Sequence, residues 1–514
     1  MAASQRLILP MPVDPSSRPA KTALLGQSLA SVPLLLGAGG DQRISPDPVH
    51  RRNRYGTLTT PAEHEISFSS TTASNVSGDG FRAAGIALER LVDRQSADPV
   101  AIDRWFADIR KGIATSLGCT DATIILAASG TDAELMALCL FAGLSARPLT
   151  NILVAPEETG SGVPRAASGC HYSDLAALGS TVEAGKPLEG LDPERIEVCT
   201  VAIRNGEGEP RRQEEIDDAM IAAVERELKR DRDVLVHVLD TSKTGLSGVT
   251  RQAARHAALL APGRVHVIVD ACQFRCSASD IRQDLADGFL VVLTGSKFVG
   301  GPPFSGALLV PTSLGEALAT RSAIPSGLSA YTAAHDWPSA LREKMDFTFG
   351  SHFNLGLGLR WVAASAALDR YAVIQDDEQA LIKAHFVKLV RARIDSVAGI
   401  RLHANDEGAH LDARTIVPFT ISNRTGGFAS FEHSQMIHLL MRERDDGPVC
   451  HLGQAVRLGS RTVLRVAASA ADVLDVSARM AAALPLHQAF HPVESRLDAV
   501  FDKLAAVLHH VRAL

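Results

Sequence analysis

Residues 293–303, LTGSKFVGGPP, place a single lysine, Lys297, directly after the apolar run Phe289–Leu293. An apolar run of this length is typical of a strand buried in a sheet, and the glycines and prolines after Lys297 predict a tight turn. The lysine is therefore expected at the end of a buried strand, where desolvation favours the neutral amine over the ammonium ion. Only the neutral amine can attack a carbonyl carbon, so this position suits covalent catalysis.

The cofactor that uses such a lysine is pyridoxal 5′-phosphate (PLP), which the amine holds as a Schiff base. The alternative is a surface lysine whose alkyl chain packs on the strand end. Asp270 supports the cofactor interpretation. It ends the run VHVIVD (265–270), and a buried carboxylate needs a cationic partner such as a protonated pyridine nitrogen. Gln273 is then expected near the ring hydroxyl. For Asp270 alone, a helix cap remains the alternative.

Three further segments supply polar side chains at the predicted strand ends. Ser129, Gly130 and Thr131 open a predicted helix, whose free N–H groups and dipole attract an anion such as the cofactor phosphate. His171, at the start of another predicted helix, is of a type that stacks on a pyridine ring and assists proton transfer. Ser242 follows a predicted strand and is expected to reach the ring hydroxyl. The alternatives are an ordinary helix cap, a packed histidine and a simple turn.

The composition indicates a globular protein with a small-molecule substrate. The chain has 514 residues, of which 46% are hydrophobic and 21% charged, and its formal net charge of −6 predicts no nucleic-acid or anionic-membrane partner. Seven scattered cysteines indicate reduced thiols, and no Cys or His set has the spacing of a metal site. Met1–Pro19 lacks a basic segment and no apolar run is long enough to span a membrane, so we expect a cytoplasmic protein.

The distribution of apolar runs predicts an α/β fold with an N-terminal arm (1–80), a large domain (81–345) and a smaller α+β domain (346–514). Helical patterns alternate with continuous apolar runs in the large domain, which indicates a mainly parallel, seven-stranded sheet. The predicted strands are 122–126, 151–155, 196–202, 234–239, 265–269, 289–293 and 307–310. In an open sheet of this kind, ligands bind beyond the carboxyl ends of the strands.

Taken in order, these segments resemble the fold type I PLP-dependent enzymes, above all the class V aminotransferase and cysteine desulfurase group. Lys297 with its glycine and proline turn resembles the Schiff-base lysine of the group. Asp270 and Gln273 match its Asp-x-x-Gln, and residues 129–131 resemble its phosphate loop. Thr294 and Ser296 occupy the small polar positions beside the lysine, although Ser296 stands where the group often has a histidine.

The resemblance implies roles for four more residues. His171, in HYS (171–173), is similar to the ring-stacking histidine of related decarboxylases. Arg465, in TVLRVAAS (462–469), resembles the arginine that pairs with the substrate α-carboxylate, with a surface salt bridge as the alternative. Ser351, in FGSHFN (349–354), resembles the loop with which a neighbouring subunit completes the phosphate site, so a homodimer is expected. Cys450 lies close to where one desulfurase subgroup has its nucleophile, although most free cysteines are inert packing residues.

The sequence thus predicts a cytoplasmic, homodimeric PLP-dependent lyase or transferase that forms an external aldimine with an amino acid, with Lys297 as general base or acid. We expect carbon–sulfur cleavage if Cys450 is catalytic and transamination to a 2-oxo acid if it is not. Decarboxylation, favoured by His171, is a third option. Two alternatives are a catalytically inactive scaffold subunit and an enzyme for an unusual biosynthetic substrate.

Overall fold

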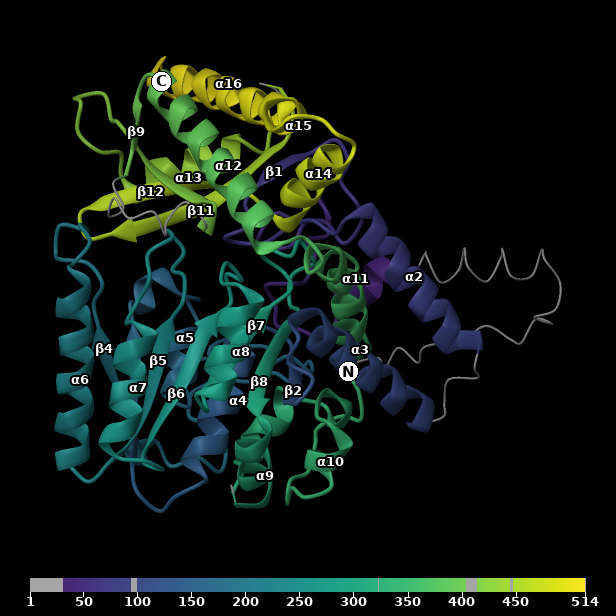
Figure 1. Ribbon diagram of the computed structural model, residues 1–514, viewed down its shortest axis with the longest axis vertical. Coiled ribbons are helices and arrows are strands. Elements are labelled where there is room, and N and C mark those ends of the chain that lie inside the picture. The colour runs from purple at the N-terminus through teal and green to yellow at the C-terminus, as the bar shows by residue number, and fades with distance from the viewer. Residues whose placement is uncertain (1–30, 94–98, 322, 404–413, 444–446, 514) are drawn as a thin grey trace.

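The computed structural model describes residues 31–93, 99–321, 323–403, 414–443 and 447–513. The chain forms two sheets, one of seven strands and one of five, with helices packed around both. In Figure 1 the smaller sheet lies above the larger one, and the C-terminal helix α16 (His491–Ala513) covers the top of the molecule.

The seven-stranded sheet has the order β2-β8-β7-β6-β5-β3-β4. The pairs among β3 to β7 are parallel, and β8 runs antiparallel to both of its neighbours. This α/β architecture with a mainly parallel seven-stranded sheet is the one that the sequence predicts, and it is confirmed. The strands are β2 (Ala122–Ala127), β3 (Leu149–Val154), β4 (Ile196–Val201), β5 (Asp233–Leu239), β6 (Val265–Ala271), β7 (Leu290–Thr294) and β8 (Gly306–Pro311).

Both faces of this sheet are buried, because alternate strand residues belong to two separate hydrophobic cores. In β6, Val267 and Val269 face one core, and Ile268 faces the other. The first core also takes side chains from α3 (Pro99–Leu117), α6 (Gln213–Lys229), α7 (Arg251–Leu260) and α8 (Ala278–Ala286). The second takes them from α4 (Gly130–Ala142) and α9 (Thr312–Arg321).

The five-stranded sheet has the order β1-β11-β12-β10-β9 and draws one strand from the N-terminal segment. That strand, β1, pairs in parallel with β11, so that Ile66 is opposite Cys450. The division into 1–80, 81–345 and 346–514 stays a prediction, and residues 1–30 of the arm lie outside the described residues. The strands are β1 (Ile66–Phe68), β9 (Ile400–Leu402), β10 (Ile416–Ile421), β11 (Cys450–Leu458) and β12 (Arg461–Ala467).

Two consecutive helices follow the large sheet in the chain. The first, α11 (Leu355–Tyr371), begins at the N-cap Asn354, whose side chain accepts a hydrogen bond from Leu357 N, and packs on α2 (Gly78–Asp93) and α3. The second, α12 (Asp376–Ser396), packs on α14 (Ala470–Ala481) and α16 of the smaller domain. These two helices connect the two sheets.

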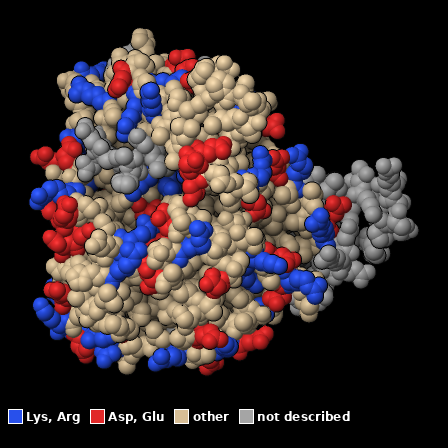
Figure 2. All heavy atoms as spheres, viewed as in Figure 1, with Lys and Arg blue, Asp and Glu red and all other residues tan. Residues whose placement is uncertain are grey.

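The surface is mixed in charge. Figure 2 shows that Lys and Arg side chains are interspersed with Asp and Glu side chains over the visible face, so neither sign dominates it. Among the described residues, the structure contains no helix with the length and apolar character needed to cross a membrane.

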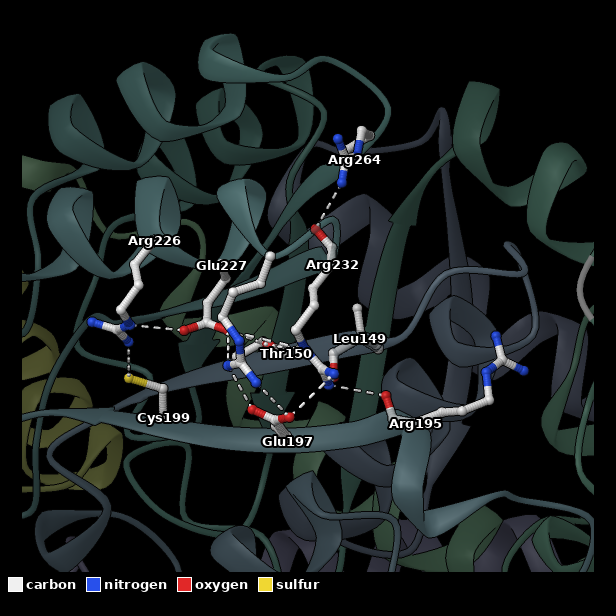
Figure 3. Close-up of polar contacts among 10 residues, drawn as sticks. Leu149, Thr150, Arg195, Glu197, Cys199, Arg226, Glu227, Arg232 and Arg264 are labelled. Atoms are coloured by element: carbon white, nitrogen blue, oxygen red, sulfur yellow. Dashed lines mark hydrogen bonds and ion pairs between the residues drawn. The ribbon is translucent and has the colours of Figure 1, made fainter.

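A network of charged side chains ties the edge strand β4 to the rest of the large sheet (Figure 3). At its centre is Glu227 of α6, which is almost fully buried and binds Arg226 (2.9 Å) and Arg230 (2.6 Å). Arg230 also binds Glu197 of β4 at 2.8 Å, and this hydrogen bond holds the pKa of the Glu197 carboxyl below its usual value. Thr150 of β3 donates to Glu227 at 3.1 Å, which joins the helix to both strands.

Replacing Glu227 with alanine is expected to reduce the free energy of unfolding by about 2 kcal/mol, because Arg230 and Thr150 lose their buried partner. Denaturant unfolding measures the effect. The matched control is Glu432→Ala, which removes an exposed pair with Arg457 and should leave stability unchanged. Equal stability of the two variants would contradict a structural role for this network.

Candidate active site

A cavity of about 170 Å³ lies where the carboxyl ends of the large-sheet strands meet β11 and β12 of the smaller sheet. It is lined by residues that follow β2, β3, β5, β6 and β7, which is the edge at which an open α/β sheet binds ligands. Nine of the residues proposed from the sequence line it: Ser129, Gly130, Thr131, Asp270, Gln273, Thr294, Ser296, Lys297 and Arg465.

Lys297 lies three residues after the end of β7, and its backbone is fixed by the N-terminal segment. Ser74 donates from Oγ to Lys297 O at 2.9 Å and from its backbone N–H to Ser296 O at 3.2 Å. The turn is close-packed as well, because a Cβ added to Gly295 would lie 2.7 Å from Cβ of Ala364. Among the described residues the Lys297 amine has no hydrogen-bond or ion-pair partner, so it is available to a ligand in the cavity.

Asp270, on β6, is nine-tenths buried and lines the same cavity. Its Oδ1 accepts a hydrogen bond from Cys272 N at 3.0 Å, which fixes the carboxylate at the strand end. Thr294 donates from Oγ1 to Cys272 O at 2.7 Å, so that β7 holds the segment after β6 in place. Neither contact neutralises the carboxylate charge. A cationic group in the cavity would do so.

Ser129 is the N-cap of α4, where its Oγ accepts from Asp132 N. The first N–H groups of α4, at Gly130 and Thr131, have no acceptor within the helix and lie at the cavity. Glycine is required at position 130, because an added Cβ would overlap Sγ of Cys272. The helix start and the segment after β6 are therefore in direct contact.

Arg465, on β12, has the features of an anion-binding group. It is 1% exposed, and Nη2 donates to Thr72 Oγ1 at 3.3 Å, whereas Nε and Nη1 have no hydrogen-bond partner. Burial lowers its pKa to about 9, against the opposing charge of Glu158, so the guanidinium still carries its charge at neutral pH. Gly453 leaves room for it, since a Cβ there would lie 2.7 Å from Arg465 Nε.

Gln273 and Ser242 already have partners within the protein. Gln273 donates from Nε2 to Thr71 O at 3.0 Å, and its Oε1 is buried without a partner beside the cavity. Ser242 is fully buried and donates to Glu158 Oε2 at 2.7 Å, so the structure does not bring it to the cavity lining. Glu158 also pairs with Arg204, which makes Ser242 part of a buried ion-pair network.

His171, Ser351 and Cys450 also lie outside the cavity lining. Residues 171–179 form turns rather than the expected helix, and His171 Nδ1 hydrogen-bonds Tyr331 Oη at 2.7 Å. Ser351 donates to Phe353 O at 3.2 Å in a loop before α11. Cys450 is 0% exposed at the start of β11, and burial raises the pKa of its thiol to about 11. This environment disfavours the thiolate that a nucleophile requires.

Two cationic residues at the cavity were not identified from the sequence. Arg43, from the N-terminal segment, lines the cavity with its guanidinium 5.2 Å from the centre of the Phe304 ring and paired with Asp41. Lys243, in the loop after β5, also lines it. Residues 31–60 show no apolar periodicity that would place Arg43. Lys243 had an available signal, because it follows Ser242 in DTSKTG (240–245), directly after the end of a predicted strand.

A buried acid that lines the cavity is paired with a histidine. Glu134 of α4 is 2% exposed, and its Oε2 is 3.1 Å from Nδ1 of His237 on β5. Burial raises the pKa of Glu134, with the charge of Asp270 adding to the effect and His237 opposing it. Within the described chain, no group of three or more His, Cys, Asp or Glu side chains is arranged to hold a metal ion.

Comparison with solved structures identifies the fold. TDC of Oryza sativa, solved with PLP and tryptamine, is 11% identical, with 98% of this chain and 100% of that chain covered and a TM-score of 0.55. The cysteine desulfurase CsdA of Escherichia coli is 13% identical, with 87% and 96% covered and a TM-score of 0.51. A NifS-like protein of Rickettsia africae is 11% identical, with 86% and 99% covered and a TM-score of 0.52.

The chain has the fold of the fold type I PLP-dependent enzymes. The fold inferred from the sequence is thereby confirmed. No family model and no curated protein matches the sequence.

Gly130→Ala is expected to destabilise the protein by about 2 kcal/mol, because the new methyl group overlaps Cys272 Sγ in a close-packed site. The double variant Gly130→Ala with Cys272→Ala removes the overlap, so its loss should be smaller than the sum of the two single losses. Denaturant unfolding of the wild type, the two single variants and the double variant measures how far the losses of stability depart from additivity. Additive losses would contradict the contact between the start of α4 and the segment after β6.

Proposed function

We propose that this protein is a PLP-dependent enzyme that transfers the amino group of an amino acid to a 2-oxo acid. The observation that carries the proposal is the arrangement of Lys297, Asp270 and the start of α4 around one cavity, which is also lined by Arg465, two of whose guanidinium nitrogens lack a partner. Each of these four features suits a ligand group of a particular chemistry. PLP and an amino acid together provide all four ligand groups.

The residues present fit the cofactor. The Lys297 amine has no partner and would take the aldehyde carbon, and the Asp270 carboxylate would hold a proton on the ring nitrogen. The N–H groups of Gly130 and Thr131 would bind the phosphate at the positive end of the helix dipole, with Arg43 adding a cation. Buried polar atoms without a partner, among them Gln273 Oε1 and Thr71 Oγ1, border the space that these groups enclose.

When bound, PLP supplies an electron sink for a bond to the amino-acid α-carbon. Arg465 would bind the α-carboxylate through Nε and Nη1, and its planar fork would fix the orientation of the amino acid. The Lys297 amine would then carry the proton that leaves the α-carbon. Residues of β11 and β12 line the cavity on the side of the smaller sheet and would limit the access of water to this proton transfer.

The positions of Cys450 and His171 favour amino-group transfer over the other reactions. Carbon–sulfur cleavage through Cys450 needs its thiolate at the cavity, and the residue is buried in β11 instead. Cys272 does line the cavity, but burial raises the pKa of its thiol, with Asp270 adding to the effect. Decarboxylation drew its support from a ring-stacking His171, which binds Tyr331. The homodimer and the cytoplasmic location stay predictions.

Lys297→Ala is expected to abolish covalent cofactor attachment. The wild-type protein, mixed with PLP, should show a visible absorbance band and, after borohydride reduction, a mass increase on the peptide that contains Lys297. The variant should show neither. Lys344→Ala, which removes an exposed amine paired with Glu316, is the matched control and should retain both signals. Attachment that persists in Lys297→Ala would exclude the proposal, and no band in the wild type would favour a scaffold role.

The reaction type is tested by incubating the PLP-loaded protein with a panel of amino acids and no 2-oxo acid. We expect one equivalent of pyridoxamine phosphate and of the matching 2-oxo acid, because no acceptor is present to complete a cycle. Chromatography of the released cofactor measures the first product. Continuous release of sulfide or carbon dioxide would identify a lyase or a decarboxylase and would contradict amino-group transfer.

A further inference from the structure

We propose that the substrate carries a second anionic group besides its α-carboxylate, and that Lys243 binds it. The substrate class is then an acidic amino acid, one with a carboxylate or another oxyanion on its side chain. This inference rests on the proposed function and adds to it the specificity of the site.

Lys243 lines the cavity from a loop that is fixed by a backbone hydrogen bond. It directly follows Ser242, and its backbone N–H donates to Glu158 O at 3.0 Å, so that the loop after β5 is tied to the segment after β3. The side chain lines the cavity together with Lys297 and Arg465. Among the described residues, no carboxylate is within ion-pair distance of the Lys243 amine.

Glu158, one of the two carboxylates whose charge acts on Lys243, already has partners within the protein. Glu158 pairs with Arg204 and accepts hydrogen bonds from Ser242 (2.7 Å) and Thr244. All of these groups are buried, so the Glu158 charge is balanced before any ligand arrives. Lys243 and Arg465 are therefore left as two basic side chains in the cavity lining without a carboxylate of their own.

The other charged groups of the cavity have partners once the cofactor is bound. Lys297 would be joined to the cofactor, Asp270 would face its ring nitrogen, and Arg43 already pairs with Asp41. A substrate with a single carboxylate would satisfy Arg465 and leave the Lys243 amine buried without an anionic partner. Such an arrangement is unfavourable, whereas a second substrate anion would neutralise it.

The charges around Lys243 support this assignment. Burial lowers the pKa of its amine to about 7, and the positive charges of Arg465 and Lys297 act in the same direction. Glu158 and Asp270 oppose the shift without cancelling it. An anion bound at Lys243 would stabilise the ammonium form, so binding would draw a proton from solution at pH values above about 7.

The test compares aspartate with asparagine and glutamate with glutamine, pairs that differ mainly in side-chain charge. The dissociation constant of each ligand for the PLP-loaded protein is read from the change in the visible cofactor band. The wild type should bind each acid about tenfold or more tightly than its amide. In Lys243→Gln, the dissociation constants of the acid and its amide should differ by a factor of about three or less, because only the binding of the acid is weakened. Lys243→Arg should preserve the preference for the acid. Lys344→Gln is the matched control and should behave as the wild type.

A second readout separates direct binding from a structural effect of the substitution. Between pH 6 and pH 8, the acid-to-amide preference of the wild type should fall as pH rises through about 7, because the amine loses its proton. In Lys243→Gln the preference should not change with pH. Wild-type protein with a cofactor band but no preference for acids would overturn this inference alone. Wild-type protein without a cofactor band would overturn the proposed function, and this inference with it.

Discussion

Burial of charged side chains at the carboxyl edge of the large sheet is the constraint on which the site depends. A charge removed from water costs several kcal/mol unless a partner offsets the loss. Glu158 meets this requirement within the protein, through Arg204, Ser242 and Thr244. Arg465 does not, because two of its three nitrogens lack a partner. The structure thus tolerates a buried guanidinium with unmet hydrogen-bonding capacity, which is expected where a bound anion completes the arrangement.

The N-terminal segment makes this arrangement possible by joining the two sheets. Arg275, beyond the end of β6, donates to Thr415 Oγ1 (2.9 Å) and Ala468 O (2.8 Å) of the smaller domain. It also donates to Ser70 Oγ at 2.7 Å, so residues from three distant parts of the chain meet at one buried guanidinium. Nearby, Thr72 accepts from Arg465, and Ser74 fixes the Lys297 backbone. The distance between lysine and arginine is therefore set through the N-terminal segment.

The sequence predicted the parts of the site that depend on local patterns. Lys297 and Asp270 follow continuous apolar runs, and strand ends of a parallel sheet converge whatever the rest of the chain does. The residues that the structure places outside the cavity lining are positioned by long-range contacts. Ser242 is withdrawn from the cavity by Glu158, which is 84 residues away in the sequence. Cys450 is buried because β1, a strand of only three residues, pairs beside it. No periodicity indicates such a short strand, and none indicates that Arg43 reaches the cavity.

The sign of the charge in the cavity follows from the same constraint. Glu134 is paired with His237 and Glu158 with Arg204, so Asp270 is the lining carboxylate left to offset the lining cations. Arg465 and Lys243 both line the cavity, and the charge of Arg465 disfavours that of Lys243. An empty cavity of this kind attracts anions before it discriminates among them. Discrimination among anions then depends on two interactions made at the same time. The ligand must pair with the planar guanidinium of Arg465 and place a second negative group at the ammonium group of Lys243.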